Sequence, residues 1–287
     1  MIPTVKAFFD EATFTVSYVV SDPQSGISAI IDSVLDFDQA SGRSSTDSAD
    51  LLIAYVEDGD LSVAWILETH VHADHLSAAP YLKSRLGGKT GVSDAITHVQ
   101  RTFKGVFNLG DEFTADGTQF DRLLSDGDLL DLGSMNIRVM HTPGHTPACL
   151  TYVSGDCAFI GDTMFMPDFG TARVDFPGGD AAALYQSIQS ILALPDETRL
   201  FMCHDYKAPG RDEFAWETTV AEQRANNVHI GGETTEQDFI EFRSTRDSQL
   251  SMPKLILPSI QVNIRAGEMP PADDNGVVYL KLPVDAL

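Results

Sequence analysis

Residues 69–75 of this chain read Thr69-His70-Val71-His72-Ala73-Asp74-His75, and they follow an apolar run, 61–67, that predicts a buried strand. Imidazoles and carboxylates are the ligands that hold zinc or iron in proteins. A junction between strand and loop is where a rigid scaffold can present such ligands to a cleft. Because a buried cluster of this kind is costly to desolvate unless it is paired or metal-bound, the stretch predicts a metal site.

Three further polar residues occupy similar positions downstream. His145 follows a Pro-Gly turn that ends a strand, which would fix the direction of its imidazole. Asp162 and His204 each follow a short apolar run that predicts a strand. This shared placement at strand ends predicts one site that unites them with residues 70–75. His98 and His229 have no such setting, and we expect them to be structural.

The composition excludes several classes of partner. Acidic residues outnumber basic ones 42 to 19, and the net charge of -23 opposes binding to nucleic acid or anionic membranes. The three cysteines lack the spacing of disulfide or structural-zinc domains. We find neither a leader peptide nor an apolar run long enough to span a bilayer. The sequence therefore predicts a soluble, cytoplasmic protein, and it leaves a homodimer open.

Two successive rounds of predicted strands and helices organise the chain. They predict an α+β fold, an αββα sandwich in which helices flank two mixed β-sheets. We expect a catalytic domain at residues 1–230, with a C-terminal helix and an extended tail at 231–287 packed on the same domain. The last forty or so residues, rich in proline, look extended. The predicted strands are 14–20, 27–31, 61–67, 136–141, 149–153, 157–161 and 199–203, and the predicted helices are 49–59, 76–86, 94–102 and 181–194.

The pattern His-x-His-x-Asp-His at 70–75, with His145, Asp162 and His204, resembles the metallo-β-lactamase superfamily over most of residues 10–230. That resemblance implies the αββα sandwich, with metal at the open edge between the sheets. More narrowly, residues 68–76, 170–176 and 204–207 look like those of the persulfide dioxygenases, also called sulfur dioxygenases.

The narrower resemblance implies a mononuclear non-haem iron enzyme. It would use one Fe(2+) per chain and dioxygen to oxidise glutathione persulfide to sulfite and glutathione. Its iron ligands fall on His70, His145 and Asp162, two imidazoles and one carboxylate that leave positions open for substrate. The resemblance leaves the remaining four residues to orient these ligands by hydrogen bonds. Those four are His72, Asp74, His75 and His204.

The same seven residues are also the ligand set of a dinuclear zinc hydrolase of the glyoxalase II type. There His70, His72 and His145 hold one zinc, Asp74, His75 and His204 hold the other, and Asp162 bridges them. A metal-bound hydroxide would attack a thioester carbonyl. Residues 164–176, Met-Phe-Met-Pro-Asp-Phe-Gly-Thr-Ala-Arg-Val-Asp-Phe, favour the dioxygenase. A third hypothesis is a metal-binding protein without catalysis, although structural zinc sites favour cysteine ligands.

An acidic protein that binds an anionic glutathione derivative needs local positive charge at its cleft. Arg173, Lys207 and Arg211 lie near the metal-bearing segments, and we expect the first two to contact a glutathione carboxylate. Tyr206 offers a hydroxyl donor in the same region. Zinc, as a mononuclear or dinuclear site, is the other metal that these ligands suit.

Overall fold

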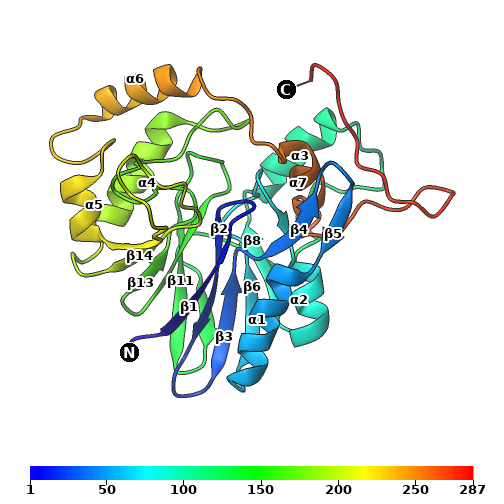
Figure 1. The fold of residues 1–287 in the computed structure, drawn as a ribbon, viewed down its shortest axis with the longest axis horizontal. Coiled ribbons are helices and arrows are strands. Elements are labelled where there is room, and N and C mark those ends of the chain that lie inside the picture. Colours follow the sequence, from blue (N-terminus) through cyan, green and yellow to red (C-terminus); the bar gives the residue numbers. More distant parts are fainter. Residues whose placement is uncertain (287) are drawn as a thin grey trace.

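The computed structural model describes residues 1–286; Leu287, the last residue of the predicted C-terminal segment, lies outside the described residues. Two six-stranded sheets face each other, and helices cover their outer faces (Figure 1). Both sheets contain parallel and antiparallel pairs. The predicted fold class, an αββα sandwich of two mixed sheets, is confirmed.

The first sheet has the strand order β1-β2-β3-β6-β8-β9. Its residues alternate between two environments: Val16, Tyr18 and Val20 of β2 pack between the sheets, whereas Val19 packs against helices. This alternation follows from the two-residue period of a strand, and it fills both faces of the sheet. The strands are β1 (Thr4–Asp10), β2 (Thr15–Ser21), β3 (Ile27–Ile31), β6 (Ser62–Leu67), β8 (Lys89–Ser93) and β9 (Arg122–Leu124).

The second sheet has the order β10-β11-β12-β13-β14-β15, and a small third sheet has the order β5-β4-β7. Tyr152 and Phe159 of the second sheet pack against the first sheet in the same buried cluster. The strands are β10 (Leu129–Leu132), β11 (Met135–His141), β12 (Leu150–Ser154), β13 (Cys157–Phe159), β14 (Arg199–Phe201), β15 (Glu217–Thr219), β4 (Val34–Asp38), β5 (Arg43–Ser45) and β7 (Leu76–Ser77).

The helices form the outer layers. Helices α1 (Asp47–Asp58) and α2 (Ala79–Leu86) bury their apolar faces against the first sheet. On the second sheet, α4 (Ala181–Leu192) packs with α5 (Val220–Asn226) and α6 (Glu236–Asp247). Helices α3 (Ile96–Val106) and α7 (Ile256–Asn263) share a third cluster beside the site. Among residues 1–286, no helix has the length and apolar character needed to cross a membrane.

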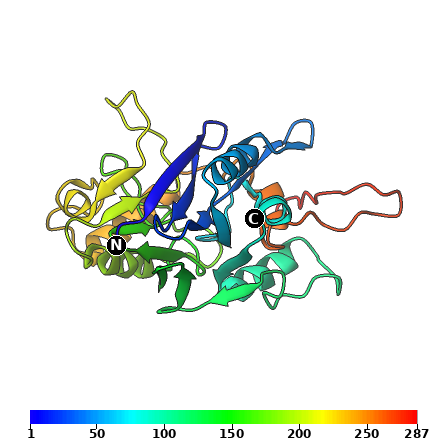
Figure 2. The same cartoon turned by 90° about the horizontal axis from the view of Figure 1, so that it is seen from below.

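Two local expectations were wrong. The predicted helix 76–86 begins with the short strand β7, because Leu76 and Ser77 pair with β4. The last forty residues are not wholly extended, because they contain α7, whose Pro258 sits in the first turn where no intrahelical N–H bond is lost. After α7 the chain projects as a long loop (Figure 2). It returns to the body where Gln261 hydrogen-bonds both backbone groups of Lys281.

Candidate metal centre

The seven predicted ligand residues meet at one edge of the sandwich. Residues 70–75 follow β6, His145 follows β11, Asp162 follows β13, and His204 follows β14. An isolated backbone pairing between Thr15 and His204 joins the two sheets at this edge. The sandwich therefore brings together residues that are 134 positions apart in the chain (His70 and His204).

His70, His145 and Asp162, here called the His70 group, form the first cluster. One ligand atom from each lies within 4.8 Å of the others. The Nε2 atoms of both histidines lie 3.7 Å from Asp162 Oδ2. Each Nδ1 has another partner: that of His145 donates to the Arg173 carbonyl at 2.8 Å, and that of His70 contacts Thr69 Oγ1 at 3.0 Å. These bonds leave both Nε2 lone pairs facing the carboxylate.

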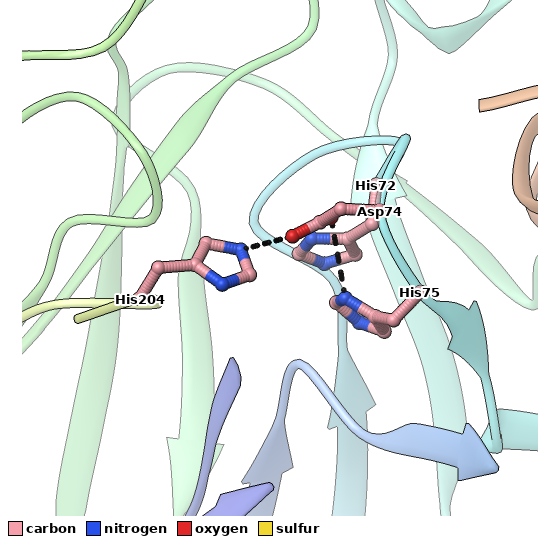
Figure 3. A group of neighbouring side chains, drawn as sticks. All are labelled: His72, Asp74, His75 and His204. Carbon is pink, nitrogen blue, oxygen red and sulfur yellow. Dashed lines mark ion pairs between the residues drawn. The ribbon is translucent and has the colours of Figure 1, made fainter. Parts of the chain in front are cut away.

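His72, Asp74, His75 and His204, here called the His72 group, form the second cluster (Figure 3). Asp74 lies between two histidines, with Oδ2 3.0 Å from His204 Nε2 and Oδ1 3.4 Å from His75 Nδ1. His204 Nδ1 donates to the Phe14 carbonyl at 3.2 Å, so its Nε2 points into the cluster. All three histidine side chains are fully buried.

Two carboxylates that the sequence analysis did not assign support these clusters. Asp32 accepts hydrogen bonds from the Thr69 backbone at 2.7 Å, the Thr69 hydroxyl at 2.8 Å and His72 Nε2 at 3.0 Å. Glu68 lies 3.2 Å from the same Nε2 and accepts a hydrogen bond from Ser77. A signal did exist for Asp32, because it directly follows a mostly apolar strand, as Asp162 follows an apolar run.

Burial and neighbouring charges decide which histidines are positively charged. Burial, assisted by the nearby histidines, lowers the pKa of His70 well below its usual value and that of His75 to about 4. Burial opposes charge on His72 too, but Asp32 and Glu68 overcome it and raise the pKa of His72. Likewise Asp74 and Asp162 outweigh burial and raise the pKa of His204 to about 9. The cluster thus attracts positive charge, as a cation site must.

A metal ion fits the polar atoms that these side chains leave without partners. Within residues 1–286, five buried ligand atoms of the two groups make no aligned hydrogen bond, although His204 Nε2 lies within ion-pair distance of Asp74 Oδ2 (3.0 Å) and Asp162 Oδ1 (3.5 Å). Such atoms are costly to bury and are rare in native proteins unless an ion or water satisfies them. Imidazole nitrogen and carboxylate oxygen suit zinc or iron. The five atoms are His72 Nδ1, Asp74 Oδ2, His75 Nε2, Asp162 Oδ1 and His204 Nε2.

A cavity of about 840 Å³ opens onto the metal centre. The whole His70 group and Asp74 line it, whereas the three fully buried histidines of the His72 group are not part of its described lining. Its aromatic wall consists of Phe14, Phe165, Phe169 and Tyr206, whose rings contact one another. Tyr206 also stacks on the His204 ring, with 13° between the planes.

The four predicted substrate residues divide into two pairs. Arg173 and Tyr206 line the cavity, although the Arg173 guanidinium is engaged by Asp175 and by the Ser251 carbonyl. Lys207 and Arg211 are outside the described lining. The Lys207 ammonium sits 4.1 Å from the centre of the Phe214 ring, and Arg211 is bound by two carboxylates, Asp168 and Asp205.

This fold and site define a class, and comparison with known proteins names it. A model of the "Metallo-beta-lactamase superfamily" matches residues 11–204. The chain belongs to this metal-dependent superfamily. It is 56% identical to "Probable metallo-hydrolase BURPS1710b_2304" of Burkholderia pseudomallei, over 99% of this chain and all of that protein. It is 48% identical to "Glyoxylase B2" of Dictyostelium discoideum, over 99% of this chain and 97% of that one.

Less similar proteins carry the name of a different activity. The chain is 26% identical to the human "Persulfide dioxygenase ETHE1, mitochondrial", over 93% of this chain and 90% of that protein. The crystal structure of ETHE1 from Myxococcus xanthus is 28% identical and superposes with a TM-score of 0.73, covering 93% of this chain and 100% of that one. Other curated relatives, 52 to 53% identical, are longer, and this chain spans 65 to 66% of their length.

Proposed function

We propose that this protein is a persulfide dioxygenase that holds one iron(II) ion per chain through the His70 group. It oxidises glutathione persulfide with dioxygen to sulfite and glutathione. The observation that carries this proposal is the set of candidate metal ligands that line the cavity. Of the seven candidate ligands, the cavity reaches the His70 group and Asp74, while His72, His75 and His204 are fully buried and outside its described lining. Two histidines and one carboxylate with open positions are typical of non-haem iron oxygenases.

The chain's own residues prepare this site for a sulfur substrate. Iron(II) bound there supplies open coordination positions at which a persulfide and dioxygen can meet. The Arg173 carbonyl holds His145 in one tautomer, with Nε2 free for the metal. The aromatic wall supplies apolar rings to the cavity that holds the metal ligands, and the hydroxyl of Tyr206, which lines the same cavity, is a hydrogen-bond donor for the substrate. The similarity to ETHE1 from Myxococcus xanthus, which extends through the whole of that chain, supports the same activity.

A second function, a dinuclear metal hydrolase acting on a glutathione thioester, also has a specific observation in its favour. Four of the buried atoms without an aligned hydrogen bond belong to the His72 group, and the four residues of that group offer ligand atoms within 4.8 Å of one another, close enough to hold another ion. The names of two similar proteins, a metallo-hydrolase and a glyoxylase, point the same way. A metal-bound hydroxide is the nucleophile that such a site supplies.

Metal content and oxygen uptake distinguish the two functions. Protein loaded anaerobically with iron(II) should contain about one iron per chain, consume oxygen with glutathione persulfide and release sulfite in step. S-lactoylglutathione should be hydrolysed poorly. Asp162→Ala should lose the metal and the activity, because it removes the only anionic ligand of the His70 group. The matched control, His98→Ala, changes an exposed histidine on α3 and should behave as the parent protein. Rapid thioester hydrolysis by protein with two ions, without oxygen uptake, would reject the dioxygenase.

A further inference from the structure

Both cationic and acidic side chains line the cavity. Four cations line it, but two of them already have carboxylate partners: Arg173 binds Asp175, and Arg243 binds Asp247. The acidic residues that line it are Asp74 and Asp162 of the metal centre and Asp38 at the β4–β5 turn. The two remaining cations are Arg246 and Lys254.

Arg246 and Lys254 are free to bind a ligand. Within residues 1–286, neither side chain has a carboxylate within 4.0 Å, and neither donates a side-chain hydrogen bond. Arg246 is in the last turn of α6, and Lys254 is in the loop before α7. Because both cations line the cavity and neither is committed to a carboxylate of the protein, they can bind an anionic ligand there.

His229 adds a neutral donor to the lining of the same cavity. Its Nδ1 accepts a hydrogen bond from the Thr171 backbone at 2.9 Å, so the proton of the neutral ring is on Nε2. Burial, and then the nearby Arg243 and Arg246, lower its pKa to about 4, which keeps the ring neutral near pH 7. Gly170 permits this packing, because a Cβ there would lie 2.2 Å from His229 Nδ1. His229, expected from the sequence to be structural, lines the cavity.

Apolar side chains line the same cavity as these cations and the metal centre. Phe165, Phe169 and Leu255 line it, together with the rings described above. A ligand that matches these surfaces has a sulfur group for the metal, an uncharged middle and a carboxylate at its far end. The net charge of -23 makes local cations necessary, because the rest of the surface repels such an anion. Screening limits that long-range repulsion to about 8 Å at physiological salt, so contact charges decide the affinity.

We propose that Arg246 and Lys254, with His229 beside them, form the subsite that binds the carboxylates of a glutathione-derived substrate. This inference rests on the proposed function for its substrate class. All three residues lie after residue 204, where the match to the superfamily model ends. The subsite is therefore built by the C-terminal part of this chain and not by the shared superfamily core, so it sets substrate specificity independently of the metal ligands.

A binding measurement with an unreactive ligand tests the subsite. S-methylglutathione, titrated calorimetrically into the metal-loaded protein, replaces the persulfide without turnover. Arg246→Ala and Lys254→Ala should each weaken binding by roughly 10- to 150-fold, the effect of losing one charge-assisted hydrogen bond. The diethyl ester of S-methylglutathione, which lacks both carboxylates, should bind the parent protein weakly and the variants no worse. Arg101→Ala, the matched control, removes an exposed cation of α3 outside the described cavity lining and should bind like the parent.

The outcomes separate this inference from the proposed function. If Arg246→Ala and Arg101→Ala bind S-methylglutathione equally well, the subsite is wrong, even when oxygen uptake with glutathione persulfide is intact. If binding depends on Arg246 but no oxygen is consumed, the subsite stands and the dioxygenase fails. A rise in KM with little change in kcat would support a role remote from the reacting sulfur. A fall in kcat at unchanged KM would contradict it.

Discussion

Asp32 offers a sharp test of how this metal centre is held, because one buried carboxylate fixes two histidine tautomers. It accepts the His72 Nε2 proton directly, which leaves His72 Nδ1 free for a metal. It also accepts the Thr69 hydroxyl proton, so Thr69 Oγ1 can accept the proton from His70 Nδ1 and leave His70 Nε2 free. Asp32→Asn keeps the size of the side chain. Asparagine also tolerates the positive φ of 53° at this position.

The amide supplies one acceptor where the carboxylate supplied two. If its NH₂ group faces Thr69, the hydroxyl must turn toward His70, which favours a proton on the metal-binding nitrogen. Loss of an outer partner of this kind typically weakens metal binding by about 10- to 100-fold, or roughly 1.4–2.7 kcal/mol. We expect Asp32→Asn to reach the upper part of that range, because His70, a ligand of the proposed iron, and the neighbouring His72 lose their orientation together.

Competition with a chelator, followed by elemental analysis, measures that affinity, and urea unfolding measures stability in parallel. Asp22→Asn is the matched control, because Asp22 is also buried and accepts hydrogen bonds from Gln24, Ser25 and Ser134 at the opposite end of β3. It should lose stability and keep its metal affinity. A metal affinity of Asp32→Asn within twofold of the parent would refute the tautomer argument.

Two further predictions concern the polypeptide around the centre. Arg211→Ala should lower the free energy of unfolding by roughly 3–5 kcal/mol in urea, because it leaves the buried carboxylate of Asp205 without its cation. KM should not change. A raised KM at unchanged stability would instead favour the substrate contact considered from the sequence. In the folded protein the pKa of His229 is lowered to about 4, whereas in the unfolded chain this histidine binds a proton below about pH 6.5. The free energy of unfolding should therefore fall as pH drops from 6.5 toward 4. His229→Gln should reduce that fall when unfolding is compared at pH 7.5 and 5. If the parent protein and His229→Gln show the same pH dependence, the ring is not held neutral.

The sequence predicted the elements whose signal is local. The strand at 27–31 and the helix start at 181 match the structure, and the strand predicted at 61–67 begins one residue later. Side-chain alternation and apolar runs reflect burial on each face of a strand, so they can be read without knowing its neighbours. Their position after predicted strands also indicated seven polar residues as candidate ligands, and all seven lie at one edge of the sandwich.

Only the tertiary structure decided which residues hydrogen-bond to those seven candidate ligands and which cations have no carboxylate partner among the described residues. The parallel pairing that sets Ile31 beside Leu67 also sets Asp32 beside the metal-binding loop, and that register depends on the whole sheet. The 19 lysines and arginines are equivalent in the sequence, but folding gives Arg211 the distant Asp168 as a carboxylate neighbour and leaves Arg246 without one among the described residues. Pairing of charges depends on contacts between distant segments, and a linear pattern carries no information about those contacts.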